Sequence, residues 1–117
     1  MRPGEDAPRY QVRVAELPAE ERPRERLLHL GPQSLTTAEL LAILLRTGSS
    51  REGVLAIASR LLREHGGLRG LAAADLATLS SEHGMGSAKA TTIAAAFELG
   101  RRLALTGDDA RPTITGP

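Results

Sequence analysis

The chain has 117 residues, of which 41% are hydrophobic but only 2% aromatic, and its net charge at pH 7 is +1. This length allows one domain with a modest core, and the scarcity of aromatic rings argues against proteins that stack the bases of single strands. The absence of cysteine excludes disulfides and cysteine-based zinc sites. No apolar run reaches the roughly 18 residues of a membrane span and no signal peptide is evident, so we expect a soluble, cytoplasmic protein.

Residues 1–19 mix proline, glycine and charges, and they predict a partly extended N-terminal arm, with a short strand in RYQVRVAEL as the alternative. A first helix is predicted near 22–30, because Pro23 suits the first helical position and Gly31-Pro32 is a stop signal. Glu20, Glu21 and Glu25 offset the charges of Arg22, Arg24 and Arg26, which favours an ordinary exposed face over a phosphate-binding one.

Thr36 and Glu39 form a capping-box pattern ahead of a helix predicted over 38–46. That helix is apolar on almost every side, so we expect it at the centre of the core. Ser49 with Glu52 offers another cap. The helix that follows has a single apolar stripe and ends after His65 at two glycines.

Residues 68–73 predict a short connecting helix, and Asp75 is a suitable N-cap for a helix that stops at Gly84. Ser87 is the expected cap of a last helix that runs to about Leu105. The remaining segment, 106–117, predicts a linker toward a missing C-terminal domain.

The predicted fold class is therefore all-α, a compact bundle of about five to six short helices within one domain at 20–105. Helix–TGSS–helix (38–65) and helix–GMG–helix (75–105) form two helix-hairpin-helix units that the connecting helix joins.

The stretch Gly84-Met85-Gly86 predicts a tight turn before the last helix. The first amides of a helix have no acceptor within it, and the helix dipole adds positive potential, so such a turn can bind an anion. Glycine permits positive φ and leaves no Cβ to hold a phosphate away. Met85 is expected to turn inward and anchor the turn.

Ser87, Ala88 and Lys89 follow in the first turn of that helix. A lysine there is unfavourable for the helix dipole unless an anion faces it. The alternative is a purely structural turn, with Gly84 as a C-cap and Lys89 solvated. The sequence leaves these two interpretations nearly balanced.

The pattern G-h-G-x-A-K-A resembles the DNA-binding helix-hairpin-helix motif. LPAEERPRERLLHLGPQSLTTAELLAILLRTG, VLAIASRLL, HGMGSAKA and FELGRRL together resemble the N-terminal domain of the bacterial RadC family. The resemblance runs from about Leu17 to Leu105. It implies a helix-hairpin-helix-type domain that precedes a JAB1/MPN-like metalloprotease-fold domain, which RPTITGP would open, and a role in DNA repair.

Two positions depart from the family pattern. Glu82 stands where the motif has an apolar residue, which leaves the end of the preceding helix open. The first hairpin, which includes Gly48, Ser49 and Arg51, lacks the G-h-G form, so its phosphate binding is the weaker prediction.

His29, His65 and His83 have no metal-ligand spacing. His65 and His83 each lie at a predicted helix C-terminus, where an imidazole favours contacts with the last carbonyls. No catalytic constellation, metal site or cofactor is predicted. The leading hypothesis is a non-enzymatic domain that binds the backbone of duplex or branched DNA without sequence preference. The runner-up is a protein-interaction or regulatory domain for an attached JAB1/MPN-like domain, which an exposed apolar patch would favour.

Overall fold

The computed structural model describes residues 22–49 and 51–115, with side chains as far as residue 106. These residues form six α-helices and a short 3-10 turn, without strands: α1 (Pro23–Leu30), η4 (Pro32–Ser34), α2 (Thr37–Leu45), α3 (Val54–His65), α4 (Leu68–Ala73), α5 (Leu76–Ser81) and α6 (Gly86–Thr115). The predicted all-α fold is confirmed. The predicted N-terminal arm lies outside the described residues.

Most helix ends follow the predicted local signals. The capping box of α2 is complete, because Thr36 accepts from the Glu39 amide and Glu39 accepts from the Thr36 amide. Asp75 caps α5 by accepting from the Thr78 amide at 2.8 Å. Gly66, in the left-handed conformation, ends α3.

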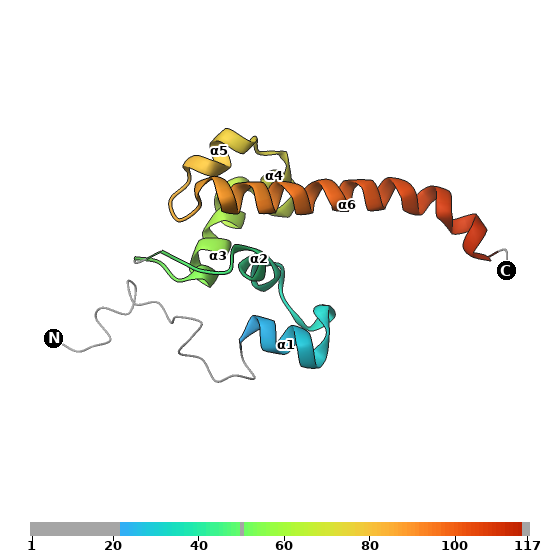
Figure 1. The fold of residues 1–117 in the computed structure, drawn as a ribbon, viewed down its shortest axis with the longest axis horizontal. Coiled ribbons are helices and arrows are strands. Elements are labelled where there is room, and N and C mark those ends of the chain that lie inside the picture. The colour runs from blue at the N-terminus through green and yellow to red at the C-terminus, as the bar shows by residue number, and fades with distance from the viewer. Residues whose placement is uncertain (1–21, 50, 116–117) are drawn as a thin grey trace.

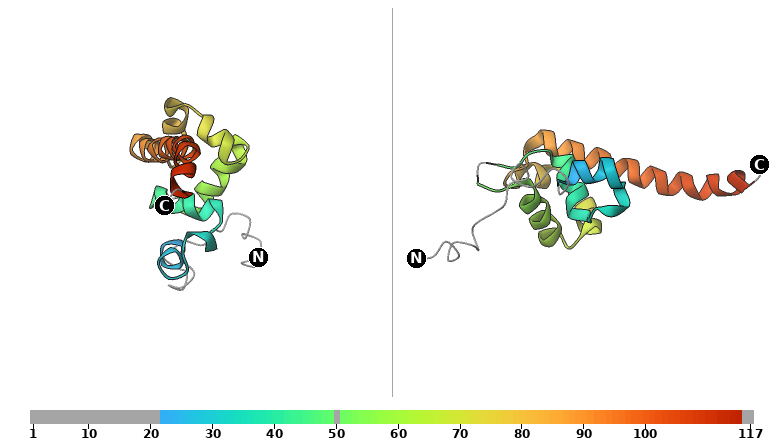
Figure 2. Two further views of the ribbon diagram at one scale, coloured as in Figure 1. Left: turned by 90° about the vertical axis from the view of Figure 1, so that its right-hand side faces the viewer. Right: turned by 90° about the horizontal axis from the view of Figure 1, so that it is seen from below.

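The two helices of each predicted hairpin pack against each other (Figure 1). α2 lies against α3, α5 lies against the start of α6, and α2 contacts α6, so the two hairpins share one core (Figure 2). The buried core consists of Leu41, Ala42, Leu45, Val54, Ile57, Ala58, Leu61, Leu71, Leu79, Met85, Ala90 and Ile93. All of these side chains are apolar, and both hairpin turns lie at one end of the bundle.

The expectation that α2 is buried on almost every side is wrong. Leu41, Ala42 and Leu45 are buried, but Leu40 and Leu44 remain 38% and 37% exposed. These two leucines lie on the side of α2 that faces a groove rather than a packed helix.

Two helix starts also differ from the predictions. Ser49 does not cap α3, whose N-cap is Gly53; its hydroxyl instead accepts from the amides of Arg51 and Glu52. Ser87 does not cap α6, because that helix already begins at Gly86.

α6 continues to Thr115, past the end predicted near residue 105. Its C-terminal half extends beyond the other helices (Figure 1). Leu99 and Leu103, near the middle of α6, are 68% and 72% exposed. The backbone stays helical through the glycine and the proline in 106–115, although both residues disfavour a helix interior. The backbone of the predicted linker is thus helical as far as Thr115.

Candidate nucleic-acid interface

The turn before α6 has the backbone conformation that the sequence predicts. Gly84 and Gly86 have φ values of +81° and +75°. Met85 between them is 6% exposed and belongs to the core. The predicted inward anchor is therefore confirmed.

The two glycines are required for different reasons. A Cβ at Gly84 would lie 2.6 Å from Ile57 Cδ1, and Ile57 is fully buried. A Cβ at Gly86 would meet nothing within 4 Å. Gly84 is thus needed for both packing and backbone conformation, whereas Gly86 is needed for conformation and faces open space.

The first turn of α6 is accessible. Gly86, Ser87 and Ala88 are exposed, and their amides open the helix, so no carbonyl of α6 can accept from them. Ala90, one turn further, is fully buried, as its small size suggests for a site where two helices approach closely. This end of α6 therefore offers amides to an anion in front of it.

Lys89 has a protein partner that the sequence does not reveal. Its ammonium donates to the carbonyl oxygen of Thr47 and lies 3.3 Å from Thr47 Oγ1. Its position is thus explained without an anion, because it links the first turn of α6 to the loop that follows α2. The same contact brings the two hairpins together at one surface.

The loop of the first hairpin, residues 46–53, contains the other predicted site residues. A Cβ at Gly48 would lie 2.3 Å from the Glu52 carbonyl oxygen, so close backbone approach explains this glycine. Ser49 Oγ lies 3.3 Å from His83 Nε2 in the second turn. Arg51 is exposed, and among the described residues no hydrogen bond or ion pair joins its side chain to Gly84–Lys89. The structure therefore unites Ser49 with the second turn, but not Arg51.

A network of ion pairs and hydrogen bonds contacts the second hairpin turn, residues 82–86. Arg60 of α3 donates to Glu52 at 3.1 Å through two nitrogens and to the His83 carbonyl at 2.7 Å. The hydrogen bond with Glu52 raises the pKa of Arg60. The Glu82 carboxylate lies 2.8 Å from His65 Nε2 and 3.6 Å from Arg60 Nη1. These contacts explain why the turn has a glutamate where the motif has an apolar residue.

The expectation that His65 and His83 contact helix carbonyls is not met, since their ring nitrogens lie beside Glu82 and Ser49. Among the described residues, no group of three or more His, Asp or Glu side chains is placed to hold a metal ion. No helix in that part of the chain is long and apolar enough to cross a membrane.

A shallow pocket of about 330 Å³ lies between the two hairpins. Arg46, Thr47, Ala88, Lys89 and Thr92 line it, together with two leucines of α2. Arg46, Thr47 and Thr92 were not predicted as site residues, because only the packing of α2 against α6 brings them to Lys89.

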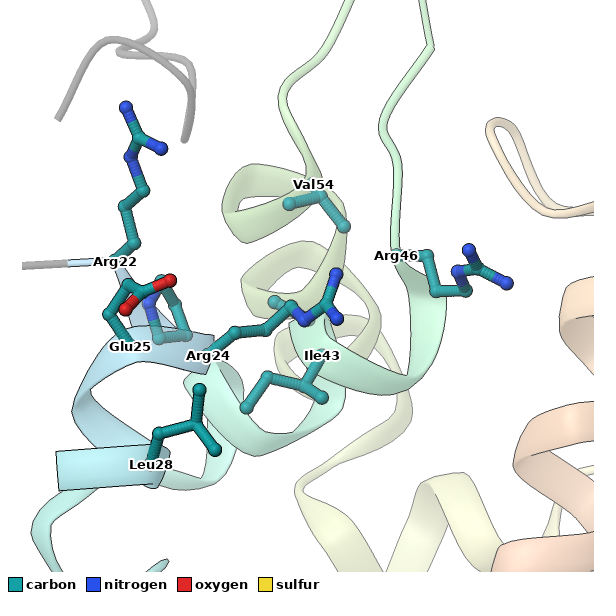
Figure 3. Close-up of a pocket in the computed structure, with 9 residues that line it drawn as sticks. Arg22, Arg24, Glu25, Leu28, Ile43, Arg46 and Val54 are labelled. Atoms are coloured by element: carbon teal, nitrogen blue, oxygen red, sulfur yellow. The ribbon is translucent and has the colours of Figure 1, made fainter. Parts of the chain in front are cut away.

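A larger pocket of about 450 Å³ lies between α1 and α2, away from the predicted site (Figure 3). Arg24 crosses it above the apolar side chains of Leu28 and Ile43. Arg46 lines this pocket too, but its guanidinium points away from Arg24 (Figure 3). Arg46 therefore lines both pockets.

Sequence comparisons identify relatives of the chain. The family model described as UPF0758 N-terminal matches residues 14–91, which include every predicted site residue. A UPF0758 protein of Methanosarcina acetivorans is 48% identical over 107 residues, which cover 92% of this chain and 46% of the relative. A UPF0758 protein of Moorella thermoacetica is 58% identical over 93 residues, which cover 80% of this chain and 41% of the relative. The chain spans about half the length of the curated relatives it matches, and no solved structure matches it.

Proposed function

The chain belongs to the UPF0758 family, and we propose that its N-terminal domain is a non-enzymatic DNA-binding domain that contacts the phosphate backbone. The observation that carries this proposal is the open N-terminus of α6. Exposed amides follow Gly86, whose missing Cβ would meet no protein atom, and a pocket with two cationic side chains lies beside them.

Contacts of this kind position a protein on nucleic acid without reading bases. The few cations at this surface predict binding on the order of 10⁻⁶ M or weaker, with strong salt dependence. The resemblance to the RadC family extends the proposal to DNA repair or recombination. We also propose that the second hairpin is a helix-hairpin-helix motif.

The proposal is tested by titrating a short fluorescein-labelled duplex with the wild-type chain and with Ser87→Glu. An acidic residue in the first helical turn stabilises a helix, so this variant should fold at least as well as the wild type. It should bind about fivefold more weakly or worse, because a carboxylate then faces the phosphate.

Ala95→Glu is the matched control, since Ala95 is an exposed alanine two turns further along α6. It makes the same change in net charge away from the turn and should bind within about twofold of the wild type. Equal losses in both variants, or no binding by the wild type at low salt, would refute the proposal.

A second candidate function, a protein-interaction domain, is favoured by an apolar groove on another face. The groove has a volume of about 220 Å³ and is lined by α2, α4 and α6, including Leu40, Leu44 and the 49% exposed Leu68. Exposed apolar surface of this kind marks interaction sites. In this candidate function, the groove binds the C-terminal half of the longer relatives, which this chain does not cover.

This candidate is tested by mixing the chain with a separately produced C-terminal half of the Methanosarcina acetivorans relative. Binding that is lost in Leu40→Gln/Leu44→Gln would support it. Absence of binding by the wild-type chain, in calorimetry at high protein concentration, would exclude it.

A further inference from the structure

α2 ends in an uncommon turn centred on Arg46. Arg46 has φ 74° and ψ −55°, and the Thr47 amide donates to the Leu45 carbonyl at 2.8 Å. These values define a γ-turn with positive φ, which is rare and strained for a residue that has a Cβ. It is the only positive-φ residue other than glycine in the described part of the chain. Glycine would end the helix without this strain, so helix termination alone does not account for an arginine here.

The surrounding structure holds this turn in place. The Arg46 amide donates to the Ala42 carbonyl at 2.9 Å, and Lys89 donates to the Thr47 carbonyl directly after the turn. Lys89 therefore fixes the turn to the first turn of α6. With its ammonium directed at both oxygens of Thr47, it has fewer donors left for a ligand.

The Arg46 side chain, in contrast, is available. It is exposed, and no carboxylate or carbonyl in the part of the chain that the structure describes accepts a hydrogen bond from its guanidinium. It lines the pocket of about 330 Å³ together with Ala88 and Lys89, and none of the residues that line this pocket is acidic. In Figure 3 its guanidinium extends away from α1 and Arg24.

We propose that Arg46 is a further phosphate-contacting residue, beside the amides of α6, and that Lys89 is a positioning residue which holds the Arg46 turn. The ligand is a phosphodiester of the DNA backbone, so the inference rests on the proposed function and adds a contact to it. A guanidinium can donate two parallel hydrogen bonds to one phosphate, which suits arginine better than lysine for this place. The strain of the turn is then the cost of directing this side chain toward the phosphate.

The experiment measures the affinity for a short fluorescein-labelled duplex at several salt concentrations. Arg46→Gln should weaken binding about threefold to fivefold at low salt and reduce the slope of log K against log salt by about 0.9, as expected for one lost phosphate contact. Arg46→Lys should retain the slope. Arg69→Gln is the matched control, because Arg69 is also an exposed arginine but lies on α4, and it should leave the slope unchanged.

Two further variants separate binding from folding. Arg46→Gly relieves the positive φ and Arg46→Ala does not, so the glycine variant should have the higher Tm. Both remove the guanidinium and should lose affinity equally. Affinities that follow Tm instead would show a structural role for Arg46 and overturn the inference.

The failures of the two proposals are distinguishable. If the wild type binds and Arg46→Gln retains both its affinity and its salt slope, the Arg46 contact is refuted while the proposed function stands. If the wild type shows no salt-dependent binding, both are refuted. A loss of slope in Arg46→Gln alone, with Arg69→Gln unchanged, supports the Arg46 contact.

Discussion

The different surroundings of the two glycines in the second turn predict different costs of substitution by alanine. Both positions have positive φ, which costs about 1–2 kcal/mol for alanine, and the restricted unfolded chain recovers about 0.4–1 kcal/mol. Gly86→Ala meets no further atom, so its net cost should be about 1 kcal/mol. Gly84→Ala in addition forces its Cβ to within 2.6 Å of buried Ile57 Cδ1, which adds about 1–3 kcal/mol of overpacking.

Urea unfolding followed by circular dichroism should therefore place Gly84→Ala about 2 kcal/mol below Gly86→Ala. Ile57→Val removes the clashing Cδ1 and provides the control. Alone it should cost about 0.5–1.5 kcal/mol, but together with Gly84→Ala the total should fall short of the sum by about 1 kcal/mol. Equal costs at the two glycines, or strictly additive costs with Ile57→Val, would refute the reasoning.

Further substitutions test other parts of the fold. At Gly70 a Cβ would lie 1.6 Å from the His65 carbonyl oxygen, whereas at exposed Gly100 it would meet nothing; Gly70→Ala should cost more than about 3 kcal/mol in urea unfolding, and Gly100→Ala should stabilise by about 0.5–1 kcal/mol. Asp75→Ala should cost about 1 kcal/mol by removing the cap of α5, and Asp75→Asn should retain most of that stability. Hydrogen bonds from Arg101 and Arg102 lower the pKa of Glu98 from 4.5 to about 2, so these contacts stabilise α6 fully above pH 4.5 and are lost as the pH falls toward 2. In an NMR titration, replacing both arginines by glutamine should return this pKa toward 4.5, and a wild-type pKa already near 4.5 would contradict the contacts.

The sequence predicts those features of the fold that depend on neighbouring residues. The capping box at Thr36, the cap at Asp75 and the glycine stop at Gly66 are local signals, and the structure confirms them. The stop predicted at Gly84 is wrong, because α5 already ends at Ser81. The positive φ of Gly84 and Gly86 follows from the same local chemistry. Helix extent is less predictable, because α6 continues through a glycine and a proline, two residues that disfavour a helix interior.

The candidate site depends on contacts between distant residues, and these could not be predicted. Lys89 and Thr47 are 42 positions apart in the sequence, so the isolated sequence suggests an anion as the reason for Lys89. Glu82 looks anomalous until α3 brings Arg60 and His65 beside it. The strained turn at Arg46 has no sequence signal, because arginine gives no indication of positive φ.

The open N-terminus of α6 is tested most directly by NMR of the ¹⁵N-labelled chain during titration with a short DNA duplex at low salt. We expect the amide signals of Gly86, Ser87 and Ala88 to shift most, since these groups donate to the phosphate. Signals on α4, remote from the turn, should remain in place. Shifts confined to other surfaces, or none at these three amides when the duplex is in excess, would contradict the proposed DNA contact.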